Sequence, residues 1–570
     1  MLNGLSCGPA SAQHCFALLR AFSSYTGSYV SLDHLFNSMK QYANSFSVHG
    51  TVGQAHMTSN ELEAMNAVLK LLASLAKWDQ TVRISLIEHP TWQPLQTLTS
   101  LVACPIPCTL KAEIFNLLAN LNISPEIGVL TWQALEGINI IAKPEIQPTK
   151  YTQGIILELQ KVESRNETYP ETCGFLHLLD QLTEHPIPDK LNFTNYLNFL
   201  IDEVYLNINK RTYHNPEEKW EMLCDVLQII VKLVKAYSPE SIPTRMSDEV
   251  IMSDSAGSIV LMNLLHDSPF LHQLLATLHS GFKILKEEDD VRAVKSHHVD
   301  RACLLSLQLL EEGLEKGEVF RKLNSSVGSH ALLSSLDSLL LGLNPTTNRA
   351  DHLMVITMFV SLQLFSPELA LSAVNILCSV SNNPSIAKQL CFILTHDPLV
   401  SSDILAGFIQ RVEVEDWETY EESDILSKED RNVTSSITSS HIRIRILQLI
   451  LININTPAPN LAHFLLGFET RAPVRDTVLQ DPGIAGNQRT CLHAILYLIS
   501  PPPTASNHFT CHSYAPIFSQ LAYQVLYTLC SHVDLSAATL RYLRSSKDFF
   551  YLQLNYVPFF QPSHTGVRSK

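Results

Sequence analysis

Apolar residues recur at helical spacing along almost the whole chain, and proline interrupts them at short intervals. One stripe starts behind Thr58, which has Glu61 three residues later as a capping box. Its apolar positions lie mostly three or four residues apart: Leu62, Met65, Val68, Leu69, Leu72, Leu75 and Ala76. A second stripe has similar spacing: Trp220, Leu223, Leu227, Ile230, Val231 and Val234. Sustained two-residue alternation between hairpin turns is scarce, so the pattern predicts an all-α protein.

X-Pro dipeptides, in which any residue precedes a proline, separate these stripes. Since proline cannot continue a helix and restricts the residue before it, each pair is expected to end one helix and start the next. The pairs are His89-Pro90, Cys104-Pro105, Ser124-Pro125, Asn215-Pro216, Ser268-Pro269, Asn344-Pro345, Ser366-Pro367, Asn383-Pro384, Asp397-Pro398 and Asp481-Pro482. Helices of roughly 10 to 17 residues, on the order of 25 in all, are typical of stacked antiparallel helix pairs of the HEAT or armadillo kind. We therefore predict one continuous α-solenoid over residues 1–570, with longer polar loops near 286–298 and 413–432.

The composition limits the partners of such a solenoid. With 570 residues, of which 46% are hydrophobic and 17% charged, the chain has ample material for a core. Its formal net charge of −15 argues against a surface that neutralises many phosphates, and no basic cluster is longer than the pair Lys210-Arg211. Direct binding of nucleic acid is therefore not expected. The twelve cysteines are scattered singly, which favours reduced thiols over a disulfide framework.

The longest stretch without a charged residue runs from Thr490 to Val533. Four prolines cut it into pieces too short to cross a bilayer, so no transmembrane segment is predicted: Pro501, Pro502, Pro503 and Pro516. The first residues, MLNGLSCGPASAQHC, lack the basic start and apolar centre of a cleavable signal. The helical runs 491–499 and 517–530 are expected to bury their apolar faces. Tyr523 and Tyr527, one turn apart, would mark a partner surface if both faced solvent.

Candidate chemistry is concentrated in LQDPGIAGNQRTCLHAILYLI, residues 479–499. A phosphate-binding P-loop needs a lysine after its last glycine, but Gly486 is followed by Asn487 and Gln488. Cys491 and His493 lie two residues apart, and such positions point to different sides of a helix, so a catalytic dyad is not expected. We interpret the stretch as a turn at 481–483 followed by a helix that Asn487 or Thr490 caps.

Other candidate ligands and acids are no stronger. Cys104 and Cys108 have metal-ligand spacing, but Pro105 and Pro107 lie between them and no second pair is near. His297 and His298 are adjacent, so they diverge on any regular element. The carboxylate pairs Glu217-Glu218 and Glu311-Glu312 stand at polar positions, without an apolar pocket to raise a pKa. We therefore predict no catalytic, cofactor-binding or metal-ligating residue.

Seven segments in order along the chain carry a family resemblance. They are EHPTWQPL (88–95), IPCTLKAEIFNLLANLNISPEI (106–127), RTYHNPEEKWE (211–221), LLLGLNPTTNRAD (339–351), SPELALSAVNILCSVS (366–381), NLAHFLLGFE (460–469) and RYLRSSKDFFYLQL (541–554). Together with LQDPGIAGNQRTCLHAIL, they resemble the giant inner-ring scaffold nucleoporins of the nuclear pore complex. None of them is a functional motif by itself.

The resemblance implies a function and a location. It implies a non-enzymatic scaffold at the nuclear envelope that binds other nucleoporins through short helical or linear segments, without a cofactor. It also implies that the chain is an interior portion of a longer solenoid. The terminal apolar runs at 15–22 and 548–560 would then lack packing partners, so we expect self-association or fraying.

Two interpretations from other classes stay open at this stage. A soluble karyopherin-like nuclear transport receptor is also an acidic helical solenoid, and it would bind the small GTPase Ran in its GTP form. A Cys/His hydrolase would need a reactive thiol, which labelling of the native protein would reveal.

Overall fold

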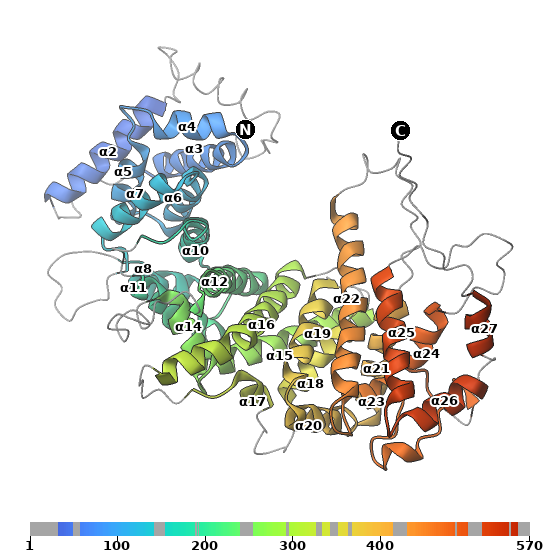
Figure 1. The fold of residues 1–570 in the computed structure, drawn as a ribbon. Coiled ribbons are helices and arrows are strands. Elements are labelled where there is room, and N and C mark those ends of the chain that lie inside the picture. The colour runs from blue at the N-terminus through green and yellow to red at the C-terminus, as the bar shows by residue number, and fades with distance from the viewer. Residues whose placement is uncertain are drawn as a thin grey trace, which may run out of the picture. The chain divides into compact units, whose positions relative to one another are not determined.

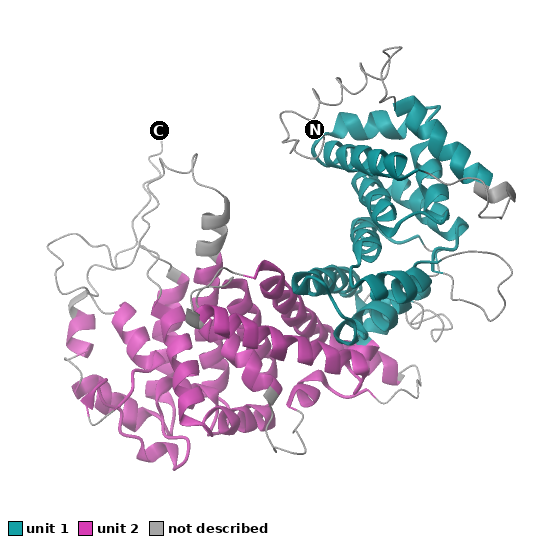
Figure 2. Cartoon of the chain, turned by 180° about the vertical axis from the view of Figure 1, so that it is seen from behind, with its two compact units in different colours: residues 1–261 teal, residues 262–570 magenta. Residues whose placement is uncertain are grey.

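The computed structural model describes residues 32–49, 58–141, 154–188, 191, 193–239, 255–291, 296–326, 333–341, 351–362, 367–413, 430–484, 487–499, 516–545 and 549–556. Helices make up 79% of the structure, and no strand occurs in these ranges (Figure 1). The prediction of an all-α fold is confirmed. The chain divides into two compact units, Met1–Leu261 and Met262–Lys570 (Figure 2). One continuous solenoid over residues 1–570 stays a prediction.

Unit 1 consists of helices that range from 3 residues in α9 to 21 residues in α12 (Figure 1). Its α-helices are α2 (Leu32–His49), α3 (Ser59–Trp78), α4 (Gln80–Ile87), α5 (Pro94–Val102), α6 (Cys108–Leu121), α7 (Pro125–Gly137), α8 (Ile155–Glu158), α9 (Ser164–Asn166), α10 (Pro170–Leu182), α11 (Thr194–Asn198) and α12 (Pro216–Ala236), and α14 (Ala256–Leu264) contains the boundary residue. The π-helical turns η2 (Leu159–Glu163) and η3 (Phe199–Tyr205) continue α8 and α11, and η4 (Ile208–Lys210) is a 3₁₀ turn. One row of packed helices contains α3, α6, α10 and α12, and a second contains α2, α5 and α7.

Both apolar stripes of the sequence face this core. In α3 the stripe residues are buried except Leu62, which is half-buried, and in α12 all six are buried. The capping box at the start of α3 is present: Thr58 Oγ1 accepts from the Glu61 N–H, and Glu61 Oε2 accepts from the Thr58 N–H at 2.9 Å. The stripes therefore mark the buried faces that join neighbouring helices.

The helices α6 and α10 approach each other very closely. A Cβ atom at Gly174 of α10 would lie 2.9 Å from both the Cα and the carbonyl oxygen of Ala112 in α6. Only glycine leaves room for this contact. Beside it, the rings of Phe115 and Phe175 pack with their centroids 5.2 Å apart. This close packing brings the N-terminal ends of the two helices together.

Unit 2 contains longer helices in a repeating order (Figure 1). They are α15 (Pro269–Val291), α16 (His297–Ser326), α17 (Leu336–Leu341), α18 (Asp351–Met358), η6 (Phe359–Ser361), α19 (Pro367–Ser381), α20 (Pro384–Leu394), α21 (Pro398–Glu413), α22 (Asp430–Ile454), α23 (Leu461–Leu466), η7 (Val474–Asp476), α24 (Cys491–Ile499), α25 (Pro516–Ser531), α26 (Ser536–Ser545) and α27 (Phe549–Tyr556). Three rows pack side by side: α17–α20–α23, α15–α18–α21–α24 and α16–α19–α22–α25. A short helix followed by two longer ones thus recurs three times, which is an armadillo-like layout.

The proline pairs start helices at six of the ten expected positions. Helices α7, α12, α15, α19, α20 and α21 begin with the proline of such a pair. Three expectations were wrong. Pro90 and Pro105 lie in turns, and α5 and α6 begin only at Pro94 and Cys108. Asp481-Pro482 also lies outside a helix, and Asn344-Pro345 lies outside the described residues. Proline is accepted in the first turn of a helix and equally well in a β-turn. A proline in the sequence therefore does not distinguish a helix start from a turn.

The predicted polar loop at 286–298 is shorter than expected. Residues 286–291 continue α15, and α16 already starts at His297. The Glu288 carboxylate accepts hydrogen bonds from the N–H and the hydroxyl of Ser296, so it ties the two helix ends together. Of the second predicted loop, 413–432, Glu413 ends α21 and Asp430 starts α22, while residues 414–429 lie outside the described ranges.

The apolar runs near the C-terminus form helices of the core. In α24 six of the nine residues are buried, and α25 buries Ala522, Val525, Leu526 and Leu529. Tyr523 is half-buried and donates a hydrogen bond to Gln553 at 2.7 Å, whereas Tyr527 is 74% exposed. The tyrosine pair therefore does not form a shared solvent-facing surface. No single described helix is long and apolar enough to cross a bilayer; α20 and α21 meet that criterion only jointly, across a bend of 113°.

Candidate functional site

Cys491 and His493 lie in the first turn of α24, but they serve different neighbours. Cys491 is fully buried, and burial raises the pKa of its thiol. The Thr490 backbone N–H donates to His493 Nδ1 at 3.0 Å, and His493 Nε2 lies 3.0 Å from the Gln480 carbonyl oxygen. The imidazole thus supports Thr490 at the start of α24, and both ring nitrogens are engaged away from the thiol. This agrees with the helix-cap interpretation of the sequence.

The two cysteines with metal-ligand spacing have separate surroundings. Cys104 is buried and donates to the Ser100 carbonyl oxygen at 3.4 Å, and burial raises its pKa to about 11. Cys108 starts α6 and lies beside Glu158 and Glu171, two carboxylates that are distant in the sequence. The neighbours of Cys108 in the structure are therefore these two carboxylates, which the spacing to Cys104 in the sequence does not indicate.

The other residues considered in the sequence lie on helix surfaces. His297 and His298 are exposed at the start of α16. Glu218 Oε1 accepts from the Tyr169 N–H at 2.6 Å, so it links α12 to the start of α10. Glu311 accepts from Asn375 on α19, and burial raises the pKa of its carboxyl. The roles of Glu218 and Glu311 in the structure are contacts between helices.

Among the described residues, a dense group of buried charges lies where α6, α8, η2 and α10 meet. We call it the buried ionic cluster, and its five residues are Cys108, Lys111, Glu158, Glu163 and Glu171. The Lys111 ammonium lies 2.5 Å from Glu158 Oε1 and 3.6 Å from Glu171 Oε1. The side chains of this triad are only 1%, 6% and 2% exposed in that order. Two carboxyl groups thus lie at a single ammonium away from water.

Glu163 has a structural task in this cluster. Helix α10 begins at Tyr169-Pro170, and Tyr169 supplies no side-chain cap. The Glu163 carboxylate takes that place: it accepts from the N–H of Glu171 at 2.7 Å and from the hydroxyl of Thr172 at 2.5 Å. Burial nevertheless raises the pKa of Glu163 to about 7, although these hydrogen bonds act in the opposite direction.

The backbone of η2 explains why Glu158 and Glu163 reach the same place. They lie five residues apart, and in a π-helical turn the hydrogen bonds also run over five residues. Side chains with this spacing point to similar sides there, whereas in a regular α-helix they diverge. The extra residue of the π turn therefore lets one segment place two carboxyls against α6 and α10.

The arrangement contains ligand types for a metal ion. Cys108 Sγ and one oxygen each of Glu158 and Glu171 lie within 4.8 Å of one another. Thiolate and carboxylate are ligands that Zn²⁺ accepts. However, the Lys111 ammonium already pairs with Glu158, so a second cation would meet a buried positive charge at contact distance. The chemistry therefore favours an internal ion pair, and the absence of a metal ligand stays a prediction.

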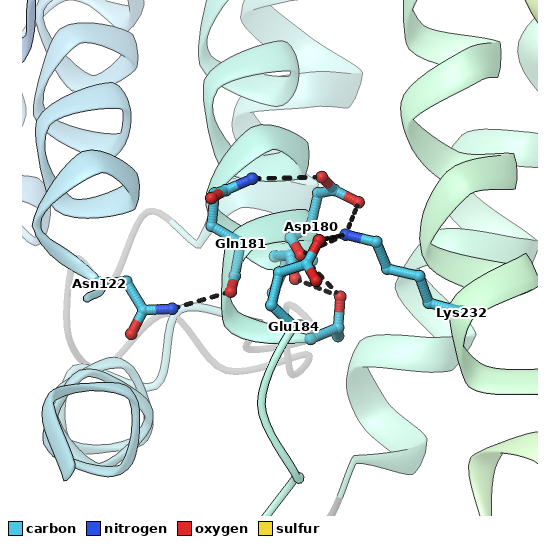
Figure 3. A network of polar contacts seen from close by, with 7 residues as sticks. Asn122, Asp180, Gln181, Glu184 and Lys232 are labelled. Atoms are coloured by element: carbon cyan, nitrogen blue, oxygen red, sulfur yellow. Dashed lines mark hydrogen bonds and ion pairs between the residues drawn. The ribbon is translucent and has the colours of Figure 1, made fainter. Parts of the chain in front are cut away.

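A second polar network ties α6, α10 and α12 of unit 1 together (Figure 3). Asn122, which follows α6, donates to the Gln181 carbonyl oxygen of α10 at 2.8 Å. Lys232 of α12 lies 2.7 Å from Asp180 Oδ1 and also pairs with Glu184. Each helix of the row is thereby linked to the next by side chains as well as by its core face.

A comparable network lies in unit 2. Asn375 of α19 donates to Glu311 of α16 at 2.9 Å, and its Oδ1 accepts from Arg445 Nε of α22 at 2.8 Å. The Arg445 guanidinium also donates to Gln448 at 3.0 Å. A single asparagine thus bridges both neighbours in the row α16–α19–α22. Such contacts fix the register of adjacent helices.

Two shallow hollows in the described part of the chain hold no catalytic constellation. One lies on α26 and is lined by Ala537, Leu540, Arg541, Arg544 and Ser545. The other lies beside α21, where Arg489 and Glu413 form an ion pair. Neither set of lining residues contains a cysteine or a histidine.

Rows of packed helices, with polar links between neighbouring helices, define the fold class of the α-solenoids. A family model described as nuclear pore complex scaffold, nucleoporins 186/192/205, matches residues 1–567. The chain belongs to this family.

Relatives with the name nuclear pore complex protein Nup205 agree with the match. The human protein is 34% identical over 589 residues, and the Drosophila melanogaster protein is 27% identical over 628 residues. Each alignment covers 98% of this chain but only 29% and 30% of the respective relative. The Arabidopsis thaliana protein is 24% identical over 79% of the chain and 22% of its own length. The chain thus spans less than a third of these relatives.

Sequence reasoning missed the buried ionic cluster, although one signal was available. Lys111 lies in the apolar stretch TLKAEIFNLL, and Ile114, Phe115 and Leu118 follow it at three, four and seven residues. A lysine in that register falls on the buried face of the helix, where it needs an anionic partner. The partners Glu158 and Glu171 come from other helices, and the sequence alone does not identify them.

Proposed function

We propose that this chain is a structural scaffold element of the nuclear pore complex at the nuclear envelope, and that its non-enzymatic role is to hold other nucleoporins of the inner ring and so to support nucleocytoplasmic transport. The observation that carries the proposal is the family match over residues 1–567. The stacked rows of helices in each unit support it, because such rows offer long surfaces for binding.

The partners proposed are short helical or linear segments of other nucleoporins. An α-solenoid recognises such segments along its surface, with apolar anchors supplied by the partner. The polar links along the rows α6–α10–α12 and α16–α19–α22 support this role, since a scaffold has to keep its surface in one shape. The family match favours this function over a karyopherin-like transport receptor.

Proximity labelling from the full-length protein in cells tests the proposal. We expect the labelled neighbours to be enriched in nuclear pore components. A pull-down with Ran loaded with GTP serves as the counter-test, because binding would indicate a transport receptor. Enrichment of soluble cargo complexes together with Ran binding would contradict the scaffold proposal.

A further inference from the structure

The buried ionic cluster has more acid than its single cation can balance. Glu158, Glu163 and Glu171 supply three carboxyls, and Lys111 supplies one ammonium. The Glu163 carboxylate accepts hydrogen bonds from the first turn of α10. Glu158 and Glu171, by contrast, compete for the same ammonium. Within the described part of the chain, the second oxygen of each, Oε2, is buried and has no hydrogen-bond partner. Two such oxygens left as anions would cost a large desolvation energy.

The geometry points to a shared proton. We propose that Glu171 is protonated in the folded chain and donates a hydrogen bond to the Glu158 carboxylate, which at the same time pairs with Lys111. The proton comes from water, and no bond other than the acid O–H changes. Lys111 is then the cation, Glu158 is the anion and Glu171 is neutral. The hydrogen bond from Glu171 to Glu158 joins α10 to α8, and it exists only while the proton is bound.

The surroundings of the pair agree with this assignment. Burial and the neighbouring Glu158 carboxyl raise the pKa of Glu171 to about 9, while Lys111 acts in the opposite direction. The other groups that face the pair are Cys108 from α6 and Glu163 from η2. Burial and the Glu171 carboxyl also raise the pKa of the Cys108 thiol, so that it stays neutral. Glu163 adds further negative potential, which favours the protonated acid.

A proton held in the fold makes stability depend on pH. The folded chain keeps this proton between the ordinary pKa of a glutamic acid, 4.5, and about 9, while the unfolded chain releases it. The folded state binds more protons across this window, so its stability falls as pH rises. One proton changes the unfolding equilibrium by up to about tenfold per pH unit. This dependence would loosen the contact between α6 and α10 in alkaline solution.

Two matched variants of the whole chain test the proposal. Glu171→Gln keeps the shape and the donor of the protonated acid but cannot ionise. Glu158→Gln removes the carboxylate that pairs with Lys111 and leaves a buried ammonium without its closest partner. Urea unfolding of both variants and of the original chain, from about pH 5 to about pH 9, gives the midpoints to compare.

The expected results differ in sign between the variants. Glu171→Gln should lose less stability with rising pH than the original chain and should have the higher midpoint at the alkaline end. Glu158→Gln should be destabilised at every pH, and adding Lys111→Met should recover part of the loss even if the single variant folds poorly. An unchanged pH slope in Glu171→Gln would overturn the proposal. A midpoint that rises with Zn²⁺ and falls with a chelator in the original chain, but not in Glu171→Gln, would assign a metal site instead.

Discussion

At the scale of single residues, Gly174 decides how closely two core helices pack. Its missing side chain lets α10 touch the backbone of α6 at Ala112, where a Cβ atom would meet two backbone atoms at 2.9 Å. Backbone cannot move aside as a flexible side chain can. We expect Gly174→Ala to lower the free energy of unfolding by about 1–3 kcal/mol, the usual cost of overpacking. The urea midpoint of the chain measures it.

Gly137 provides the matched control for this prediction. It is the last residue of α7, and a Cβ atom there would meet nothing within 4 Å. Alanine also loses less backbone entropy than glycine in a helix, so Gly137→Ala should leave stability unchanged or raise it by up to about 1 kcal/mol. Equal losses in both variants would show that the close contact with Ala112 does not determine the result.

The thiols give a second prediction at this scale. The nine cysteines within the described ranges are all buried or half-buried. Burial raises the pKa of Cys378 to about 11 and that of Cys391 to about 12, so few of these thiols are ionised near neutral pH. We expect maleimide to label these nine slowly in the native chain and quickly in urea, with mass spectrometry reporting each site. One cysteine that reacts at the denatured rate in the native chain would support the hydrolase interpretation.

At the scale of elements, Lys232 links α12 to α10. Its ammonium contacts Asp180 and Glu184 and is mostly covered, with 17% of the side chain exposed. We expect Lys232→Met to lower stability by up to about 1 kcal/mol and the loss to shrink at high salt, because screening weakens partly exposed ion pairs. Lys322→Met is the control: Lys322 pairs with Glu318 on the same helix and is 71% exposed. Its effect should be smaller, and a larger one would contradict this account.

The sequence predicted the elements well where the local pattern determines them. The capping box at Thr58 and the apolar stripes of α3 and α12 follow from side-chain periodicity, which is local information. The turn at 481–483 is also present, with Gly483 at a φ of 85° and the Ile484 N–H donating to the Asp481 carbonyl oxygen. Local rules therefore recovered helices, caps and this turn.

Prediction failed where contacts between segments distant in the sequence determine the structure. The polar residues after Lys286 looked like a loop, but they continue α15, and Glu288 pairs with Ser296 across the break. Lys111 and its partners Glu158 and Glu171 meet over sequence separations of 47 residues or more, and a π turn follows directly after Glu158. The periodicity of apolar residues predicts neither the Glu288–Ser296 hydrogen bonds nor the ion pairs of Lys111.

At the scale of the whole molecule, the chain combines two kinds of cohesion. Apolar faces of the helices form the core, and polar bridges such as Asn375 then select one register among several that the apolar faces would allow. A solenoid without such bridges could slide between neighbouring packings. This gives a physical role to Asn375 and Arg445 between the helices of a scaffold.

The face of α27 carries the last prediction. Phe550, Tyr551 and Leu554 are 41%, 67% and 69% exposed, and their spacing of three and four residues places them on one side of the helix. Contiguous exposed apolar surface favours association between copies in water. We expect the 570-residue chain to associate as its concentration rises, and the double variant Tyr551→Gln, Leu554→Gln to reduce this without changing the melting temperature.

Light scattering over a concentration series measures the association, and Val533→Gln is its control. Val533 is 83% exposed, but it lies between α25 and α26 and outside this face. Removing one isolated apolar side chain should leave the association unchanged. If the double variant associates as strongly as the original chain, the contact lies elsewhere, because glutamine keeps the helix while removing the apolar surface that drives the contact.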